Sequence, residues 1–489
     1  MRNRFEQQLE IGVLPIGETK ISPKIKNALT QVLAGLLVLY NDKKHSAKIC
    51  KLLEDSLLKN KKQTGRKGMT LWQIFVLAQV RLSENMTYER LHDMANNHLT
   101  LRSLLGVGAD NGGFTLTHFE YQNIYDNVSK LSDELLKDIN LVIVEFGHQK
   151  IFKKKETEAL RLKSDSFVVE SNVHFPTDYN LLFDCVVKSL SEISKIEEKH
   201  GIKGWRKLSD WKKEIKGLMR ELGKTNSSGG KNKEKRVKTA ATKYINKTQA
   251  LSEKINKILP KLPIKTVSDL QNTIQLEGYL ELMDKHIDLV YRRLIKGEDI
   301  PHQEKLFSIF EQYTEWVMKG KKRPSVELGK KLTITTDQFN LIIDYQIMNH
   351  QQDSSILIDL AIRILARYKV DIWSFDKGYW SKENQMMLEM EVPHVIMPKL
   401  GKRTKEEELI EKSTFFKKHK NLHSTIESNI NELESRGLDR CPDRGFPRFK
   451  SYIGLGVCAY NIKKIGKVIL DKEREELKKA KRGKALLVA

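Results

Sequence analysis

The chain has 489 residues, and its 86 Lys and Arg residues outnumber its 63 Asp and Glu residues, for a net charge of +23. This length is enough for two or three domains with ample core. The positive excess is spread along the chain and favours a polyanionic partner, with nucleic acid ahead of an acidic membrane surface. The longest uncharged apolar run, residues 28–40, is too short to cross a bilayer, and the N-terminus lacks the apolar core of a signal peptide. We therefore expect no membrane segment.

The cysteines and histidines form no metal-binding motif. Cys50, Cys185, Cys441 and Cys458 are far apart, which is typical of reduced thiols, so we expect a cytoplasmic protein. The histidines are also scattered. A lone pair four residues apart, His419 and His423, is better explained as surface coincidence than as a zinc site, because no further ligands cluster nearby.

The first 150 residues are expected to be helical and to bind DNA. Residues 69–82 have the apolar spacing of a helix, and short helices are predicted over residues 88–107. Two interpretations stay open for this pattern, namely a helix-turn-helix that reads DNA and an ordinary small helical bundle.

A strand is predicted next, over residues 159–171 around Asp165, because apolar and polar residues alternate there. A long helical stretch follows and contains a Gly/Ser/Lys-rich loop at residues 224–238. Strand patterns return over residues 325–348, with Asp337 as a hairpin turn. An amphipathic helix from Asp353, a strand over residues 370–376, a helix, a short strand over residues 393–398 and a long helix over residues 405–436 complete the pattern.

One mixed sheet with helices packed on it is the economical arrangement of these elements. The fold class is therefore α+β or mixed α/β, with five strands, a large helical insertion after the first strand and an N-terminal helical domain. The predicted parts are an N-terminal region at 1–150, the first part of the core at 151–180, the helical insertion at 181–320, the remainder of the core at 321–470, and a basic tail at 471–489.

Three carboxylates stand where this arrangement places element ends. Asp376 ends a predicted strand, just before the turn former Gly378 and the helix-capping Ser381. Ligands of open α/β sheets bind at such an edge. Asp165 lies in the first strand. Glu427 lies beside the apolar stripe that Leu422, Ile426, Ile430 and Leu433 form on the long helix, from which it can lean over the rim of the sheet.

Bare carboxylates repel one another when they are brought together, and hard divalent cations remove that repulsion. Two Mg²⁺ ions, or Mn²⁺ in their place, clamp the attacking and leaving oxygens of a phosphodiester exchange. We therefore predict that Asp165, Asp376 and Glu427 are both metal ligands and catalytic residues. Basic residues that flank the strand and helix ends are the predicted DNA contacts, namely Lys377, Lys399, Lys402, Arg403, Arg440 and Arg444.

Other carboxylates are weaker choices for the site. Glu170, Asp178 and Asp184 lie near Asp165, but Asp178 follows Pro176-Thr177 and suits a capping role. Asp371 opens its strand instead of closing it, and Asp443 lies in a loop. His174 is better explained as a packed or turn-bonded histidine.

At these residues the sequence resembles the bacterial insertion-sequence DDE transposases, most closely the ISNCY grouping. The resemblance lies in SNVHFPTDYNLLFD (171–184) after the first Asp, DKGYWSKEN (376–384) at the second, and HSTIESNINELESRGLDRCPDRG (423–445) with YIGLGVCAYNIKKIG (452–466) at the Glu. It extends from about residue 65 to 467. It implies an RNase H-like core in which Asp165, Asp376 and Glu427 form the DDE triad.

The sequence also departs from that pattern. Ser166 replaces the usual Thr after the first Asp, and Lys420, His423 and Glu434 stand where some relatives have Tyr, Arg and Lys. Details tied to that signature, such as hairpin formation at DNA ends, are therefore not carried over. The 211 residues between Asp165 and Asp376 require the helical insertion to be looped out of the core.

The resemblance implies a metal-dependent transposase that cleaves double-stranded DNA at the terminal repeats of its element and joins the ends to target DNA. We expect a homodimer on DNA in the bacterial cytoplasm, at the nucleoid when it is bound. Two alternatives stay open, namely an RNase H-like endonuclease that does not join strands and a non-catalytic DNA-binding protein.

Overall fold

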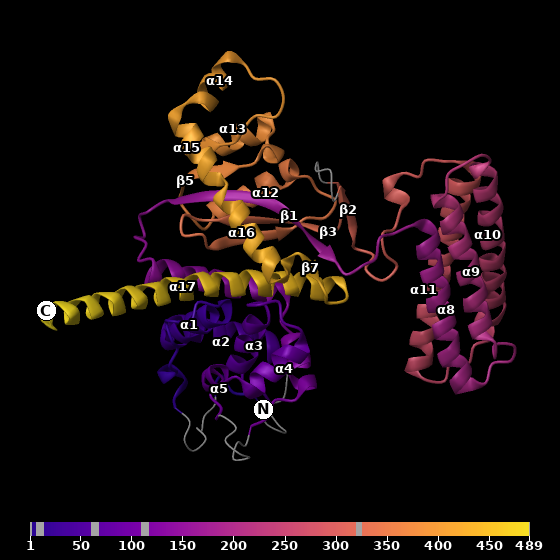
Figure 1. Ribbon diagram of the computed structural model, residues 1–489, viewed down its shortest axis with the longest axis horizontal. Coiled ribbons are helices and arrows are strands. Elements are labelled where there is room, and N and C mark those ends of the chain that lie inside the picture. The colour runs from indigo at the N-terminus through magenta and orange to yellow at the C-terminus, as the bar shows by residue number, and fades with distance from the viewer. Residues whose placement is uncertain (1, 6–13, 60–67, 109–116, 319–324, 489) are drawn as a thin grey trace. The chain divides into compact units, whose positions relative to one another are not determined.

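The computed structural model describes residues 2–5, 14–59, 68–108, 117–318 and 325–488, with side chains up to residue 480. The chain divides into two compact units. One unit combines Met1–Asn172 with Val317–Ala489, and the other is Val173–Trp316 (Figure 1).

Among the residues that the structure describes, seven α-helices precede the first strand. They are α1 (Ala28–Asn41), α2 (Lys43–Leu57), α3 (Leu71–Arg81), α4 (Tyr88–Asn97), α5 (Leu99–Leu104), α6 (Tyr121–Val128) and α7 (Asp133–Phe146). Thr70 starts α3 with a capping box, in which its side chain accepts from the backbone N–H of Gln73. Every residue of α3 is buried, so this helix, one of the two in the proposed helix-turn-helix, cannot itself contact DNA.

The C-terminal helix α17 (Phe446–Val488) joins the N-terminal helices to the sheet. It packs on α1, α3, α7 and a strand, and Figure 1 shows it running between the N-terminal helices and the sheet layer. Glycines make its contact with α1 close. A Cβ at Gly466 would meet the carbonyl oxygen of Gln31 at 1.8 Å, and one at Gly35 would meet that of Ile462 at 2.2 Å. The helix continues through residues 471–488, which the sequence had suggested as a tail.

The sheet is mixed and open, with seven strands. They are β1 (Leu160–Ser171), β2 (Glu315–Met318), β3 (Val326–Thr336), β4 (Ile342–Ile347), β5 (Val370–Phe375), β6 (His394–Ile396) and β7 (Arg440–Cys441). The order is β2-β3-β1-β5-β6, with β4 paired to β3 and β7 paired to β1. The predicted fold class is confirmed, but the strand number is not, because the very short β2 and β7 were missed.

Helices cover both faces of the sheet. Five of them follow β4, namely α12 (Asp353–Leu365), α13 (Lys382–Glu391), α14 (Lys405–Lys412), α15 (Thr414–His423) and α16 (Thr425–Leu433). On one face Leu160 and Leu162 pack with Ile356 and Leu360 of α12. On the other face Ile372 and Ile396 pack with Phe416 of α15.

The single long helix predicted over residues 405–436 is wrong. The chain breaks at Ser413, whose backbone is extended and whose side chain caps α15, and again at Ser424, between α15 and α16. Leu422 consequently leaves the predicted apolar stripe and is 44% exposed, whereas Ile426 of α16 is fully buried.

The second unit is a four-helix bundle. Its helices are α8 (Asp178–His200), α9 (Leu208–Ser227), α10 (Lys233–Ile258) and α11 (Val267–Tyr291). Both α8 and α10 pack on α9 and on α11, which closes the ring. Each helix contributes to one core, for example through Cys185, Leu222, Tyr244 and Leu280. The insertion thus has its own hydrophobic core and can interrupt the sheet without entering it.

A buried ion pair fixes the segment that follows β7. The guanidinium of Arg81, which is 3% exposed, donates to both carboxylate oxygens of Asp443 at 2.8 and 2.6 Å and stacks over the ring of Tyr88. This bidentate contact gives Asp443, one of the weaker choices for the site, a structural role.

We predict that Asp443→Asn lowers the free energy of unfolding by about 3 kcal/mol, because it leaves the Arg81 charge buried without its counter-ion. Urea unfolding followed by tryptophan fluorescence measures the loss. The matched control is Glu54→Gln, which breaks the exposed pair with Arg4 and should cost less than about 1 kcal/mol. Equal losses in the two variants would contradict this prediction.

Candidate active site

The register of two parallel strands brings Asp165 and Asp376 together. Ser164 of β1 lies opposite Phe375, the last residue of β5. The next position on β1 is Asp165, and the next residue after β5 is Asp376, which precedes the short 3₁₀ turn Lys377–Tyr379. Neighbouring strands are about 4.8 Å apart, so the two aspartates start from adjacent positions at one edge. The predicted capping role of Ser381 is confirmed, since its side chain accepts from the N–H of Asn384.

Glu427 approaches the same place from a helix. It lies in the first turn of α16, which packs on β1. The preceding residue, Ile426, is fully buried, while Glu427 itself is exposed. Among the described residues, neither Glu427 nor Asp376 has a side-chain hydrogen bond or an ion pair. Both carboxylates are therefore available to a ligand.

Electrostatics link the three acidic residues. The pKa of Asp165 is raised to about 7, chiefly by burial and to a lesser extent by the charges of Asp376, Asp353 and Glu427, against a hydrogen bond from the Ser166 N–H that lowers it. That N–H donates to Asp165 Oδ1 at 2.7 Å. A carboxyl group with such a pKa is neutral about half of the time near neutral pH, because burial, together with the neighbouring carboxylates, disfavours its charged form.

Asp353, a fourth carboxylate at this place, was not predicted as a site residue. It opens α12, where its Oδ1 accepts from the Ser166 hydroxyl at 2.6 Å and its Oδ2 accepts from the Lys331 ammonium at 2.7 Å. A Cβ at Gly378 would lie 3.1 Å from Asp353 Oδ2, so glycine lets the turn after Asp376 approach. Asp353 thereby ties β1, β3 and this turn together. The sequence placed Asp353 at the start of a helix, and this position was the only signal for a role at the site.

The acidic residues are suitable ligands for a divalent cation, but their side chains do not lie close enough together to share one. Carboxylate oxygens are the ligands that Mg²⁺ and Mn²⁺ prefer. In the part of the chain that the structure describes, however, no three acidic, His or Cys side chains are close enough to hold a metal ion. Asp376 and Glu427 are both exposed, and neither has a hydrogen-bond or ion-pair partner for its side chain among the described residues.

The six predicted DNA contacts fall into two groups. Lys399 pairs with Glu407 at 2.7 Å, Arg403 pairs with Glu411 at 2.8 Å, and Arg440 pairs with the weaker site choice Glu170 at 2.6 Å. The other three cations, Lys377, Lys402 and Arg444, are exposed and have no ion-pair partner among the described residues. Only this second group presents charges that the chain itself does not neutralise.

The remaining weaker choices in the other unit also have partners. Asp178 pairs with Arg293 at 2.8 Å, and Asp184 lies 3.3 Å from the imidazole of His174. These contacts occur within the helical bundle and account for the two carboxylates without a catalytic role. In contrast, Asp376 and Glu427 have no ion pair of this kind within the described part of the chain.

Two basic side chains beside the carboxylates were also not predicted. The Lys163 ammonium donates to the Thr425 hydroxyl at 2.6 Å, and burial lowers its pKa. His423 Nδ1 lies 3.0 Å from the Ser374 hydroxyl, and burial lowers the pKa of this histidine to about 4, although the charge of Asp376 opposes that shift. The alternation of β1, which places Lys163 on the face of Asp165, was the available signal.

The comparisons with known proteins agree with this geometry. Residues 293–462 match a protein family described as "Transposase DDE domain". This stretch of the chain is similar to transposase DDE domains. This match confirms the resemblance to insertion-sequence DDE transposases and supports an RNase H-like core with a nuclease activity of the transposase type. No curated protein and no solved structure matches the chain significantly.

The matched residues include Asp376 and Glu427 but not Asp165, because the match begins at residue 293, near the end of the helical insertion that follows β1. Register places Asp165 in the core all the same. Among the described residues, no helix is both long and apolar enough to cross a membrane, and all four cysteines are buried free thiols.

We predict that Asp165→Asn raises the melting temperature of the metal-free protein by several degrees at about pH 8, and by less at about pH 5. The folded-state pKa near 7 lies above the ordinary value of 3.8. The stability contributed by this group is therefore complete below pH 3.8 and is lost as the pH rises through about 7.

Differential scanning fluorimetry measures this effect, and Asp371→Asn at the start of β5 is the control. Added Mg²⁺ should stabilise the wild-type protein more than Asp165→Asn, because a ligand that binds only the folded state stabilises it. A wild-type protein that is as stable as the variant at high pH without metal would contradict the prediction.

Proposed function

We propose that the chain is a metal-dependent DNA transposase, with Asp165, Asp376 and Glu427 as its catalytic carboxylates. The observation that carries this proposal is the β1–β5 register, which aligns Asp165 with Asp376, together with the effect of the Glu427 charge on the pKa of Asp165. The reaction would hydrolyse DNA at the terminal repeats of a mobile element and then join the freed 3′-hydroxyls to target DNA.

The three carboxylates differ in how firmly the structure holds them. Asp165 is fixed by the strand and by the Ser166 N–H, so it provides the rigid ligand. Asp376 and Glu427 are exposed, and they would close on the ions from either side. Bound Mg²⁺ or Mn²⁺, two ions by our expectation, would neutralise the carboxylates, activate the attacking hydroxyl and stabilise the departing oxygen. Lys377, directly after Asp376 and without an ion-pair partner in the described chain, is placed to contact a DNA phosphate.

We expect Asp165→Asn, Asp376→Asn and Glu427→Gln each to reduce Mg²⁺-dependent strand cleavage by about a thousandfold, while DNA binding persists. Plasmid nicking measures cleavage, and fluorescence anisotropy measures binding. Asp371→Asn, which removes an acidic residue at the start of β5 that is not part of the proposed triad, is the matched control. Wild-type rates in all three variants would eliminate this catalytic assignment.

Joining separates a transposase from a nuclease with the same core. Duplexes with free 3′-hydroxyl ends are incubated with a circular target plasmid and Mg²⁺, and covalently joined product is measured on denaturing gels. The proposal expects joined product that depends on Asp165. Cleavage without any joined product would favour the endonuclease. Joining of paired ends also calls for two copies of the chain, so we expect a dimer on DNA.

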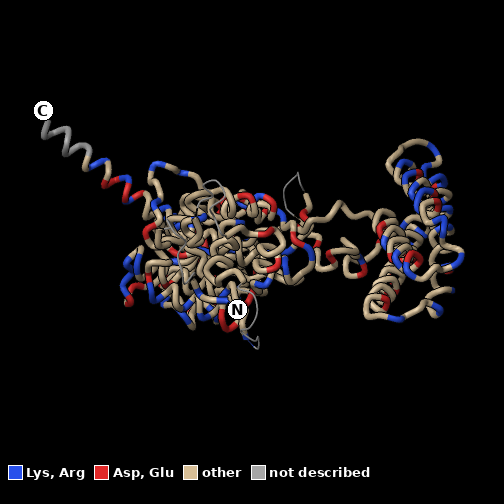
Figure 2. The backbone as a smooth tube through the Cα atoms, turned by 90° about the horizontal axis from the view of Figure 1, so that it is seen from below, with Lys and Arg blue, Asp and Glu red and all other residues tan. Residues whose placement is uncertain are grey.

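The helical insertion is strongly asymmetric in charge and is a second proposed DNA contact. Helices α9 and α10 carry thirteen Lys and Arg against five Asp and Glu, whereas α8 and α11 carry four against ten. Because these pairs form opposite sides of the ring, one side is basic and the other acidic. Figure 2 shows the basic residues crowded along the insertion. A groove of about 540 Å³ at the α9–α10 turn is lined by Lys231, Lys235 and Arg236, among others.

We predict that changing Lys231, Lys233 and Lys235 together to Gln makes the salt dependence of DNA binding shallower, by about one unit of logarithmic slope for each lost phosphate contact. Anisotropy titrations at several NaCl concentrations measure the slope. The control changes Lys188, Lys195 and Lys199 of α8 to Gln, which removes the same charge from the acidic side. Equal slopes for the two triple variants would contradict a DNA contact at α10.

A further inference from the structure

Three charged side chains form a row on one face of β1. Successive residues of a strand point to opposite faces, and residues two apart are separated by about 6.7 Å. Arg161, Lys163 and Asp165 therefore stand on one face, while Leu160 and Leu162 pack with α12 on the other. In register, Lys163 lies opposite Thr336 of β3 and Ser374 of β5. The row leads along the strand directly to the carboxylate site.

Among the described residues, neither cation of this row has an ion-pair partner. The side chain of Lys163 donates there to the neutral hydroxyl of Thr425, and the charge of Asp337 acts on it without a direct ion pair. Arg161 is exposed, and its guanidinium has no hydrogen-bond or ion-pair partner in the described chain, although its backbone N–H donates to Gln338 Oε1 at 3.0 Å. Two other enclosed cations of this unit are paired with carboxylates, namely Arg81 with Asp443 and Lys331 with Asp353. A half-buried ammonium with a neutral partner is costly unless an anion completes its surroundings.

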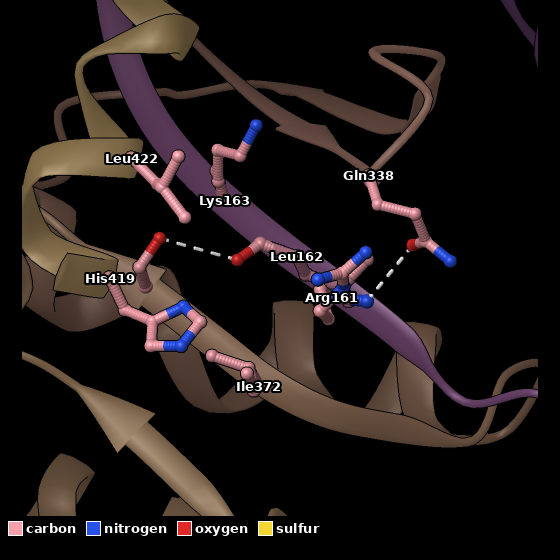
Figure 3. A pocket seen from close by; sticks show the side chains of 8 residues that line it. Arg161, Leu162, Lys163, Gln338, Ile372, His419 and Leu422 are labelled. Atoms are coloured by element: carbon pink, nitrogen blue, oxygen red, sulfur yellow. Dashed lines mark hydrogen bonds between the residues drawn. The ribbon is translucent and has the colours of Figure 1, made fainter. Parts of the chain in front are cut away.

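A cavity of about 160 Å³ opens beside both cations. Figure 3 shows its walls, formed by β1, by Ile372 of β5, and by His419 and Leu422 of α15. None of the described residues that line it is acidic. Two buried polar atoms of the neighbouring positions, Thr336 Oγ1 and His423 Nε2, also have no partner in the described structure. This surface offers positive charge and hydrogen-bonding groups to an anion.

We propose that Arg161 and Lys163 bind consecutive backbone phosphates of the DNA strand that is cut at Asp165. This inference rests on the proposed function and names two positioning residues for it. Phosphate contacts fix the register of a protein on DNA, and a strand anchored along the row presents its next phosphodiester to the carboxylates. The cations also offset the repulsion between the DNA backbone and the acidic site.

The test is the salt dependence of DNA binding, measured by anisotropy with a fluorescein-labelled duplex in Ca²⁺ buffer. Lys163→Gln and Arg161→Gln should each weaken binding several-fold and make the logarithmic salt slope shallower by about one unit, and the double variant by about two. Lys163→Arg should keep the wild-type slope because it keeps the charge. Lys137→Gln, an exposed lysine of α7 paired with Asp133, is the matched control.

Wild-type slopes in Lys163→Gln and Arg161→Gln, with wild-type melting temperatures, would overturn the inference. So would a loss of binding that Lys163→Arg does not restore, because it would indicate a packing role. The readout does not depend on catalysis. If the wild-type protein binds with the expected slopes but never cleaves DNA with Mg²⁺ or Mn²⁺, the proposed function fails and the phosphate contacts stand.

Discussion

The mutual repulsion of carboxylates at one edge of the sheet is the constraint on which the rest of the structure depends. Strand register sets Asp165 beside Asp376, and burial together with the surrounding acidic charges lifts the pKa of Asp165 to about 7. A fold gains nothing in stability from such a grouping, so its natural explanation is a positively charged ligand. The neighbouring cations Lys163 and Arg161 have no ion-pair partners among the described residues. They are therefore available to the phosphates of a DNA strand bound at the metal ions.

The helical insertion explains how residues so distant in sequence can share this edge. It leaves the core after β1 and returns before β3, and its own hydrophobic core makes it compact without the sheet. The family match begins only near the end of the insertion. Strand β1, which precedes the insertion in sequence, nevertheless pairs with β3 and β5, which follow it. Strand β1 and the catalytic candidate Asp165 are thus separated in sequence from the rest of the sheet by the helical bundle. In our proposal this bundle makes its own contact with DNA.

Local patterns were sufficient to predict the strands that carry the acidic residues. The alternation around Asp165 and the Gly378–Ser381 turn chemistry after Asp376 are short-range signals. Ion pairs do not follow from such patterns. Arg440 pairs with Glu170, which is 270 positions away, and the pairs that Lys399 and Arg403 form with nearby glutamates depend on the turn that precedes α14. The breaks at Ser413 and Ser424 were missed because helical periodicity continues across them, and Asp353 was missed because its role depends on contacts with Ser166 and Lys331.

The most direct test of the central claim is anomalous diffraction from crystals of the protein with DNA and Mn²⁺. The account predicts manganese peaks bounded by the carboxylate oxygens of Asp165, Asp376 and Glu427, with DNA phosphate oxygens completing the coordination. Manganese bound elsewhere, or a Glu427 side chain that stays directed away from ions held by the two aspartates, would contradict it.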